Sequence, residues 1–141
     1  MRRFLFLLIL LLGLPNKSFG EEQAFPEYAM KAAFIYNFTL FTQWPELPNN
    51  TLQICTFRAH QIKDELELYA ASKKPHQANL VITKIDRSDD IGLCQAVFLS
   101  EEDLPQAPAV FVAAKEKPLL VITDVSDLIN KGAMIVIKIE N

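Results

Sequence analysis

The chain has 141 residues, of which 14 are Lys or Arg and 17 are Asp or Glu, giving a net charge of −3 at pH 7. This length is enough for one domain with one hydrophobic core. Because the chain is acidic and has no basic run, nucleic acid is excluded as a partner.

Residues 1–20 have the pattern of a Sec-type signal peptide. A basic region, Met1–Arg3, precedes an apolar stretch, Phe4–Leu14, and a small-x-small cleavage site ends at Gly20. The apolar stretch is too short for a stable membrane anchor, which needs about 20 residues. The sequence therefore predicts a periplasmic domain, residues 21–141, with no direct membrane insertion after cleavage. An uncleaved anchor is the alternative.

The segment Tyr28–Pro45 is rich in aromatic residues and is predicted to be a helix. It has no glycine, and its only proline is its last residue. At about 100° per residue, its apolar side chains form two separate stripes. The two stripes are Phe34–Phe38–Phe41 and Tyr36–Leu40–Trp44. Since a surface helix needs only one apolar stripe, we expect this helix to be buried against two different partners.

The two stripes are expected to have different roles. We expect Phe34 and Phe38 to be core residues that anchor the helix to the sheet. Tyr36, Asn37 and Trp44 carry polar atoms that burial would leave in need of partners, so they are better candidates for a binding site. The full set of partner or pocket candidates is Tyr36, Asn37, Leu40, Phe41, Trp44 and Pro45. Plain core packing is the alternative for most of these residues.

The rest of the chain alternates short apolar stretches with helical segments. The predicted strands are Leu52–Phe57, Asn79–Ile85, Gln95–Leu99, Pro118–Thr123 and Ala133–Ile139. Helical segments are predicted over Ile62–Ala70, in part over Leu104–Lys117 after a cap at Ser100, and in a short stretch that ends at Lys131 before Gly132. This alternation predicts a single α/β domain with a mostly parallel or mixed five-stranded sheet and helices on both faces.

No catalytic or cofactor motif is evident in the sequence. A nucleotide site needs a glycine-rich turn after the first strand, and Thr56–His60 contains no glycine. His60 and Asp64 have the spacing of a helical pair, but a third metal ligand is not evident. We therefore expect no cofactor, no metal and no enzymatic activity. The alternative is a hydrolase in which two carboxylates, or a Ser–His pair, converge in a cleft.

Cys55 and Cys94 both lie in the part of the chain that is predicted to be exported. Two thiols in an oxidising compartment most simply form one disulfide. Two separate buried thiols are the alternative.

Several ordered segments resemble the YfiR family of exported bacterial proteins. The longest, Lys31–Pro45, matches the family's opening motif almost throughout. The others are Ile54–Cys55 together with Cys94, Val97–Glu101, and Pro118–Asp124 followed by Gly132–Ile135. The resemblance implies that the two cysteines form a disulfide. Two departures are Ala133, where the family usually has a second glycine, and the missing glycine after the first strand.

The resemblance implies a periplasmic regulator. The best-known type of member represses an inner-membrane diguanylate cyclase by binding its periplasmic part, and an outer-membrane lipoprotein sequesters the repressor. Repression lowers cyclic di-GMP and biofilm formation. A homodimer is a further expectation. The family usually continues with another strand end and helix, so we expect either a short member or a truncated one. The alternative function is a small-ligand-binding periplasmic domain with a pocket walled by Tyr36, Phe41 and Trp44.

Overall fold

The structure is a computed structural model that describes residues 27–75 and 78–140. The predicted signal peptide, residues 1–20, and its cleavage site lie outside the described residues. Within the described ranges, no helix is both long enough and apolar enough to cross a membrane.

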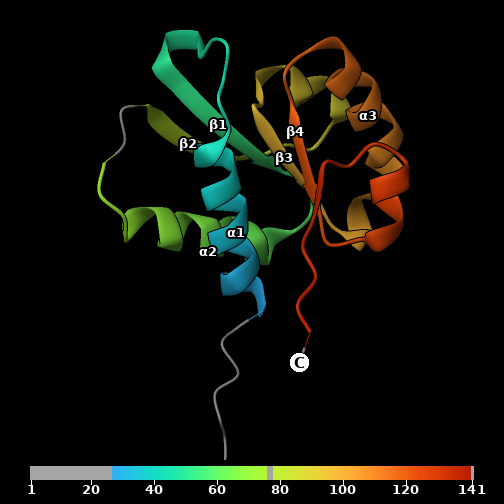
Figure 1. The fold of residues 1–141 in the computed structure, drawn as a ribbon, viewed down its shortest axis with the longest axis horizontal. Helices are drawn as coiled ribbons and strands as arrows, with labels where there is room; N and C mark the ends of the chain where they lie inside the picture. The colour runs from blue at the N-terminus through green and yellow to red at the C-terminus, as the bar shows by residue number, and fades with distance from the viewer. Residues whose placement is uncertain (1–26, 76–77, 141) are drawn as a thin grey trace, which may run out of the picture.

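Five parallel strands form one sheet in the order β2-β1-β3-β4-β5 (Figure 1). The strands are β1 (Thr51–Thr56), β2 (Asn79–Lys84), β3 (Ala96–Leu99), β4 (Leu120–Thr123) and β5 (Ile135–Val136). This arrangement confirms the predicted single α/β domain, and the sheet is parallel throughout rather than mixed. The chain moves outward from β1 to β2 and then crosses back to β3, so the order reverses between β1 and β3. Such a reversal is a topological switch point.

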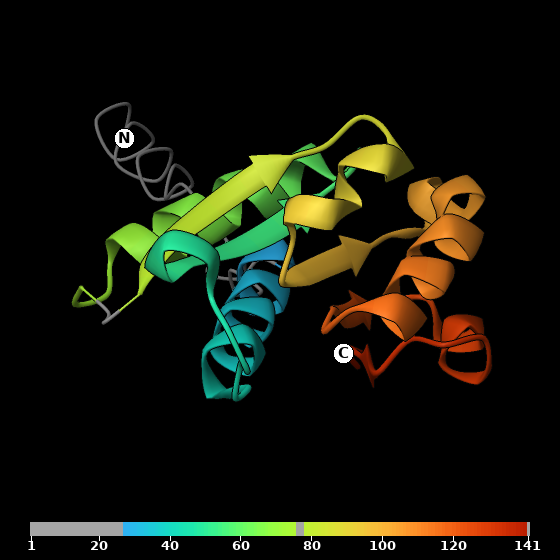
Figure 2. The same cartoon turned by 90° about the horizontal axis from the view of Figure 1, so that it is seen from above.

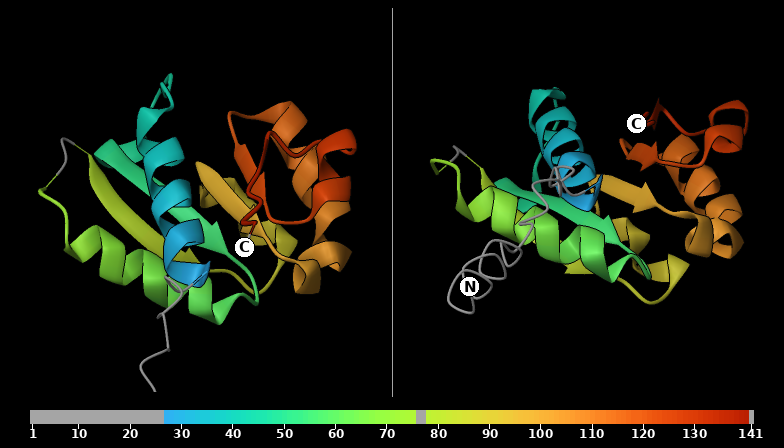
Figure 3. Two further views of the ribbon diagram at one scale, coloured as in Figure 1. Left: turned by 60° about the horizontal axis from the view of Figure 1, so that its bottom comes forward. Right: turned by 90° about the horizontal axis from the view of Figure 1, so that it is seen from below.

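Helices cover both faces of the sheet (Figures 2 and 3). The α-helices are α1 (Glu27–Phe41), α2 (His60–Ala71) and α3 (Ala107–Glu116). The 3-10 helices are η1 (Pro48–Asn50), η2 (Ser88–Leu93), η3 (Glu101–Gln106) and η4 (Ser126–Asn130). Helices α1 and α2 pack against one face, whereas η2, α3 and η4 contribute to the core on the other face.

Alternation along β1 shows how one strand serves both halves of the core. Ile54 packs in the cluster that contains Ile35 of α1 and Leu66 of α2. The next residue, Cys55, packs in the opposite cluster with Val110 of α3. Successive side chains of a strand point to opposite faces, so Ile54 and Cys55 bury β1 on both sides.

The predicted length of the last strand is wrong. We expected it to span Ala133–Ile139, but β5 contains only Ile135–Val136. The amides of Met134 and Ile137 still donate to carbonyl oxygens of β4, at 2.9 and 2.8 Å. Apolar alternation therefore located the strand, but it did not show how soon regular pairing ends.

The partly helical prediction for Leu104–Lys117 is confirmed. Pro105 lies inside η3, and Pro108 lies in the first turn of α3. A proline in the first turn of a helix costs little, because the N–H groups there have no partner within the helix. Gly132 follows η4 with a φ of 135°, as expected for a glycine just past a helix end.

Candidate functional site

The outward face of α1 carries the clearest exposed apolar surface that the sequence analysis singled out. The side chains of Phe34, Phe38 and Phe41 are 43%, 37% and 82% exposed, and we call these three residues the aromatic stripe. The rings of Phe34 and Phe38 are stacked with their centroids 6.2 Å apart. The prediction that Phe34 and Phe38 are core residues is therefore wrong.

The opposite face of α1 is the buried one. Tyr36 is only 2% exposed, and its ring meets Tyr69 of α2 edge-on with the centroids 5.1 Å apart. Asn37 Nδ2 donates to the Tyr69 hydroxyl at 3.5 Å. Burial and the nearby Tyr69 raise the pKa of Tyr36. Of the binding candidates, Tyr36 therefore lies in the core, and Asn37 contributes to the contact between α1 and α2.

The predicted helix ends earlier than expected, and this changes the place of Trp44. Helix α1 ends at Phe41, so Trp44 and Pro45 lie in the loop that follows. The Trp44 indole N–H donates to the Thr39 carbonyl at 3.0 Å, and its half-buried ring packs with Leu40 against the core. The polar atom of Trp44 thus has a partner within the chain.

A cavity of about 430 Å³ lies beside this loop, at the amino-terminal end of the sheet. Trp44, Pro45 and Lys117 contribute to its lining. The sequence analysis expected Tyr36, Phe41 and Trp44 to wall one pocket. They do not, because Tyr36 is in the core and Phe41 is exposed. The structure brings together only part of the predicted pocket.

Lys31 is a residue of the inner face that the sequence analysis did not select. Its ammonium lies 2.8 Å from an Asp124 carboxylate oxygen and also pairs with Glu27. Burial lowers the pKa of Lys31, but the hydrogen bonds to Asp124 and Glu27 outweigh this effect and raise the pKa overall. The Glu27–Lys31 spacing of four residues was the only signal of this pairing in the sequence.

Asp103 is a second residue that the sequence analysis did not select. Its buried carboxylate accepts hydrogen bonds from the Arg58 amide at 3.0 Å and from the Ser100 amide and hydroxyl at 2.9 and 2.8 Å. Asp103 therefore holds the segment after β1 next to the segment after β3. The cap expected at Ser100 is present, and it depends on this carboxylate.

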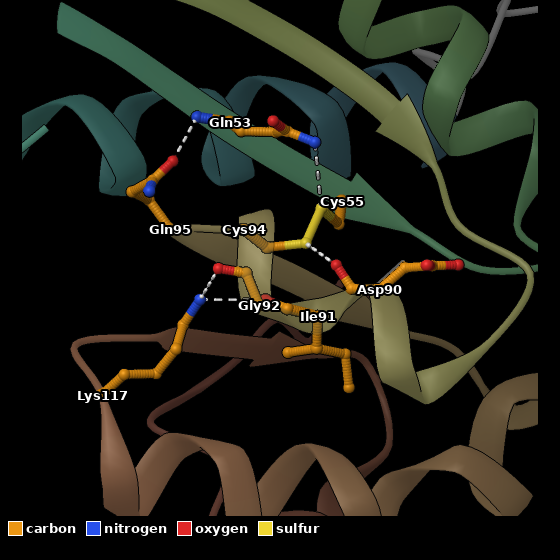
Figure 4. Close-up of a disulfide and its surroundings, with 8 residues drawn as sticks. All are labelled: Gln53, Cys55, Asp90, Ile91, Gly92, Cys94, Gln95 and Lys117. Carbon is orange, nitrogen blue, oxygen red and sulfur yellow. Dashed lines mark hydrogen bonds between the residues drawn. A yellow bond between two sulfur atoms is a disulfide. The ribbon is translucent and has the colours of Figure 1, made fainter. Parts of the chain in front are cut away.

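Cys55 and Cys94 form the disulfide that the sequence predicted (Figure 4). Both residues are fully buried, and the disulfide joins β1 to the segment just before β3. Beside it, the backbone amide of Gln53 donates to the Gln95 side-chain oxygen at 2.7 Å. The Lys117 ammonium donates to two carbonyl oxygens at the end of η2, and burial lowers the pKa of Lys117.

Over residues 27–75 and 78–140, no three His, Cys, Asp or Glu side chains gather in a way that could hold a metal ion.

A family model described as YfiR/HmsC-like matches residues 28–141. A comparison with curated proteins found no match. The family match includes the described strands and helices from Tyr28 of α1 to β5. The chain therefore belongs to the YfiR/HmsC-like family, whose members are periplasmic regulators of diguanylate cyclase signalling.

Proposed function

We propose that this protein represses a membrane-bound diguanylate cyclase by binding the periplasmic domain of the cyclase through the aromatic stripe. The stripe is the observation that carries the proposal, because three phenylalanines stand exposed on one helix. Exposed apolar clusters of this kind are typical of protein interaction sites. Aromatic side chains also contribute a large share of the binding energy at the centres of interfaces.

Two further partners belong to this proposal. An outer-membrane lipoprotein sequesters the regulator and so relieves the repression of the cyclase. A second copy of the chain forms a homodimer, which sedimentation of the purified protein would detect. A single monomeric species at all concentrations would contradict the homodimer. It would not bear on the cyclase contact, which is tested separately.

The proposed location is the periplasm, reached after cleavage at Gly20. Mass spectrometry of the exported protein is expected to give Glu21 as the first residue. A protein that keeps residues 1–20 and stays with the membrane would contradict this location.

Deletion of the gene tests the pathway. Loss of a cyclase repressor should raise cellular cyclic di-GMP and increase biofilm formation. Unchanged cyclic di-GMP in every growth condition would count against the proposal.

The surface is tested by a triple variant, Phe34→Ser, Phe38→Ser and Phe41→Ser. We expect it to fold, to lose binding to the periplasmic domain of the cyclase by at least about tenfold, and to fail to restore low cyclic di-GMP in the deletion strain. The matched control replaces three exposed apolar residues on other elements, Leu68, Val112 and Ile129, by serine. Equal binding by both variants would exclude the aromatic stripe as the contact surface.

A small-ligand-binding function is the second candidate, and the cavity beside Trp44 and Pro45 favours it. Trp44 is the only tryptophan in the chain, so its fluorescence reports on this cavity alone. A saturable change on titration with candidate metabolites would support a ligand there. A lack of change across charged and aromatic metabolites would count against it.

A further inference from the structure

The cavity of about 430 Å³ beside Trp44 has mostly apolar walls. The Trp44 ring and three prolines contribute them: Pro45, Pro48 and Pro118. The indole N–H already donates to the Thr39 carbonyl, so the ring presents only apolar surface. A cavity of this size is typical of sites for small molecules. The walls therefore suit a ligand with an apolar body.

Gln95 provides a polar group in the same lining. Its side chain is only 9% exposed. Its Oε1 accepts a hydrogen bond from the Gln53 backbone amide at 2.7 Å, and because a backbone N–H can only donate, this bond fixes which way the side-chain amide is turned (Figure 4). Over residues 27–75 and 78–140, Nε2 of Gln95 has no hydrogen-bond partner. Since buried polar groups normally have partners, this donor points to a ligand with an acceptor.

Lys117 adds a positive charge to the lining. Its ammonium donates to the Ile91 and Gly92 carbonyls at 2.9 and 2.7 Å (Figure 4), and these bonds hold it in place. An ammonium has three donors, so one remains for a ligand. Burial lowers the pKa of Lys117, and no carboxylate in the described part of the chain forms an ion pair with it. The charge of Lys117 therefore lacks a counter-ion.

The topology of the sheet brings these two donors together. Gln95 directly precedes β3, and Lys117 lies shortly before β4, which pairs with β3 in parallel. The Leu120 amide donates to the Gln95 carbonyl at 2.8 Å, which fixes the start of β4 beside Gln95. One ligand group in the cavity can therefore accept hydrogen bonds from both side chains.

We propose that this cavity binds a small carboxylate with an apolar body, an inference that rests on the ligand-binding function proposed above and names the class of ligand. A carboxylate only accepts hydrogen bonds, and its two oxygens match the free donors of Gln95 and Lys117. The hydrocarbon part packs against Trp44 and the prolines. Glu46 also lines the cavity and repels an anion, so the carboxylate lies at the Lys117 end.

Three six-carbon probes of different charge test the ligand class: hexanoate, hexylamine and 1-hexanol. Trp44 fluorescence of the purified chain is the readout. We expect a saturable change with hexanoate and at least about tenfold weaker binding of the other two probes, because a charge-assisted hydrogen bond is lost. Equal or stronger binding of hexylamine or hexanol would overturn the carboxylate class but keep a ligand site. No saturable change with hexanoate up to about 10 mM would overturn the class as well. If no candidate metabolite binds either, the ligand-binding function itself fails.

Two variants test the donors separately. Gln95→Glu keeps the shape and the acceptor for Gln53 but replaces the free N–H donors by an oxygen. Hexanoate binding should weaken at least about tenfold, and hexylamine should become the tighter ligand of the two. Unchanged preference for hexanoate in this variant would overturn the site.

Lys117→Met removes the ammonium and is also expected to weaken hexanoate binding at least about tenfold. The matched control, Lys115→Met, removes the same charge from an exposed position of α3 that does not line the cavity. Equal weakening by both lysine variants would show a general charge effect and would overturn the site. Melting curves establish that each variant folds, and if one does not, the other decides the outcome.

Discussion

Lys31 shows how a single buried charge can determine the orientation of a helix. Burial of an unpaired ammonium would be costly. The face of α1 that carries Lys31 can be buried because Asp124 and Glu27 form ion pairs with the ammonium. Among the other inward residues, Ala32 is small and Ile35 and Thr39 are β-branched, whereas Tyr36 is large and packs against α2. One lysine therefore helps to decide which of two apolar stripes is buried.

Replacement of Lys31 by methionine is expected to destabilise the fold by about 1–3 kcal/mol, because the Asp124 carboxylate loses its partner. The control is Lys63→Met, which breaks an exposed pair with Glu67 and should cost at most about 0.5 kcal/mol. Urea unfolding of both variants measures the difference. Equal effects of the two substitutions would contradict the role given to Lys31.

The same pair makes a prediction about pH. The folded-state pKa of Lys31 is raised above its ordinary value of 10.5, so the stabilisation is fully present below that value and is lost as the pH rises through the folded pKa. The stability difference between the unmodified chain and Lys31→Met should therefore stay constant from neutral pH to about pH 9 and shrink above 10.5. A difference that already falls near neutral pH would argue against this ion pair.

Gly132 is required by its backbone and by its neighbour. Its φ of 135° is unfavourable for any other residue, and a Cβ placed there would lie 2.9 Å from the Phe111 ring. Gly132→Ala should cost about 1–3 kcal/mol, whereas Gly92→Ala, where a Cβ meets nothing within 4 Å, should cost less than about 0.5 kcal/mol. Thermal unfolding of the two variants makes the comparison, and similar melting temperatures would contradict it.

At the scale of elements, α1 is the helix whose burial the sequence could not determine. Both of its stripes are apolar, so periodicity identifies a helix but does not say which side faces the sheet. The inner face is chosen by fit to α2, where Tyr36 meets Tyr69, and by the pairing of Lys31 with Asp124. Neither contact has a signature in the sequence, since each joins positions that are far apart along the chain.

Two substitutions on α1 test the orientation of this helix. Ile35→Ala removes a fully buried side chain and should destabilise the fold by about 2–4 kcal/mol. Phe38→Ala removes a larger but exposed side chain and should cost less than about 1 kcal/mol. Chemical denaturation gives both values, and the reverse order would show that the aromatic stripe is in the core after all.

The strands could be predicted because their apolar patterns are local. The disulfide could be predicted because the chain has only two cysteines. Four of the five strands lie close to their predicted positions, and the cysteine pair had only one intramolecular way to combine. The site could not be predicted in this way. Gln95 and Lys117 reach one cavity only because the parallel strands β3 and β4 begin at the same edge of the sheet. Strand order is set by the packing of the whole domain, so no single segment of the sequence determines it.

At the scale of the whole molecule, the disulfide links β1 to the segment just before the central strand β3 and closes a long stretch of chain. A closed loop of about 40 residues corresponds to about 4 kcal/mol in the chain-entropy estimate, and measured values are often lower. The bond also connects the two sides of the switch point, at which the order of the strands reverses.

Removal of the disulfide by Cys55→Ala with Cys94→Ala should lower stability by about 2–4 kcal/mol and reduce the melting temperature by at least several degrees. Because both cysteines are fully buried, a reductant should act on the native protein only as fast as the protein opens. Melting curves with and without reductant check both points. An unchanged melting temperature in the double variant would contradict a stabilising role.

The pairing of Lys31 with Asp124 has a consequence for the order in which the fold assembles. The two residues are 93 positions apart, although they are in direct contact. Since the chain is made from its amino end, α1 is complete long before β4 and the carboxylate that follows it exist. The helix can pack on α2 through Tyr36 and Tyr69 before then, but Lys31 gains its partner Asp124 only after β4 has been added. Contacts of such long range make folding slow. Until α1 has packed on the rest of the fold, both of its apolar stripes are open to water, whereas the finished protein exposes only the aromatic stripe.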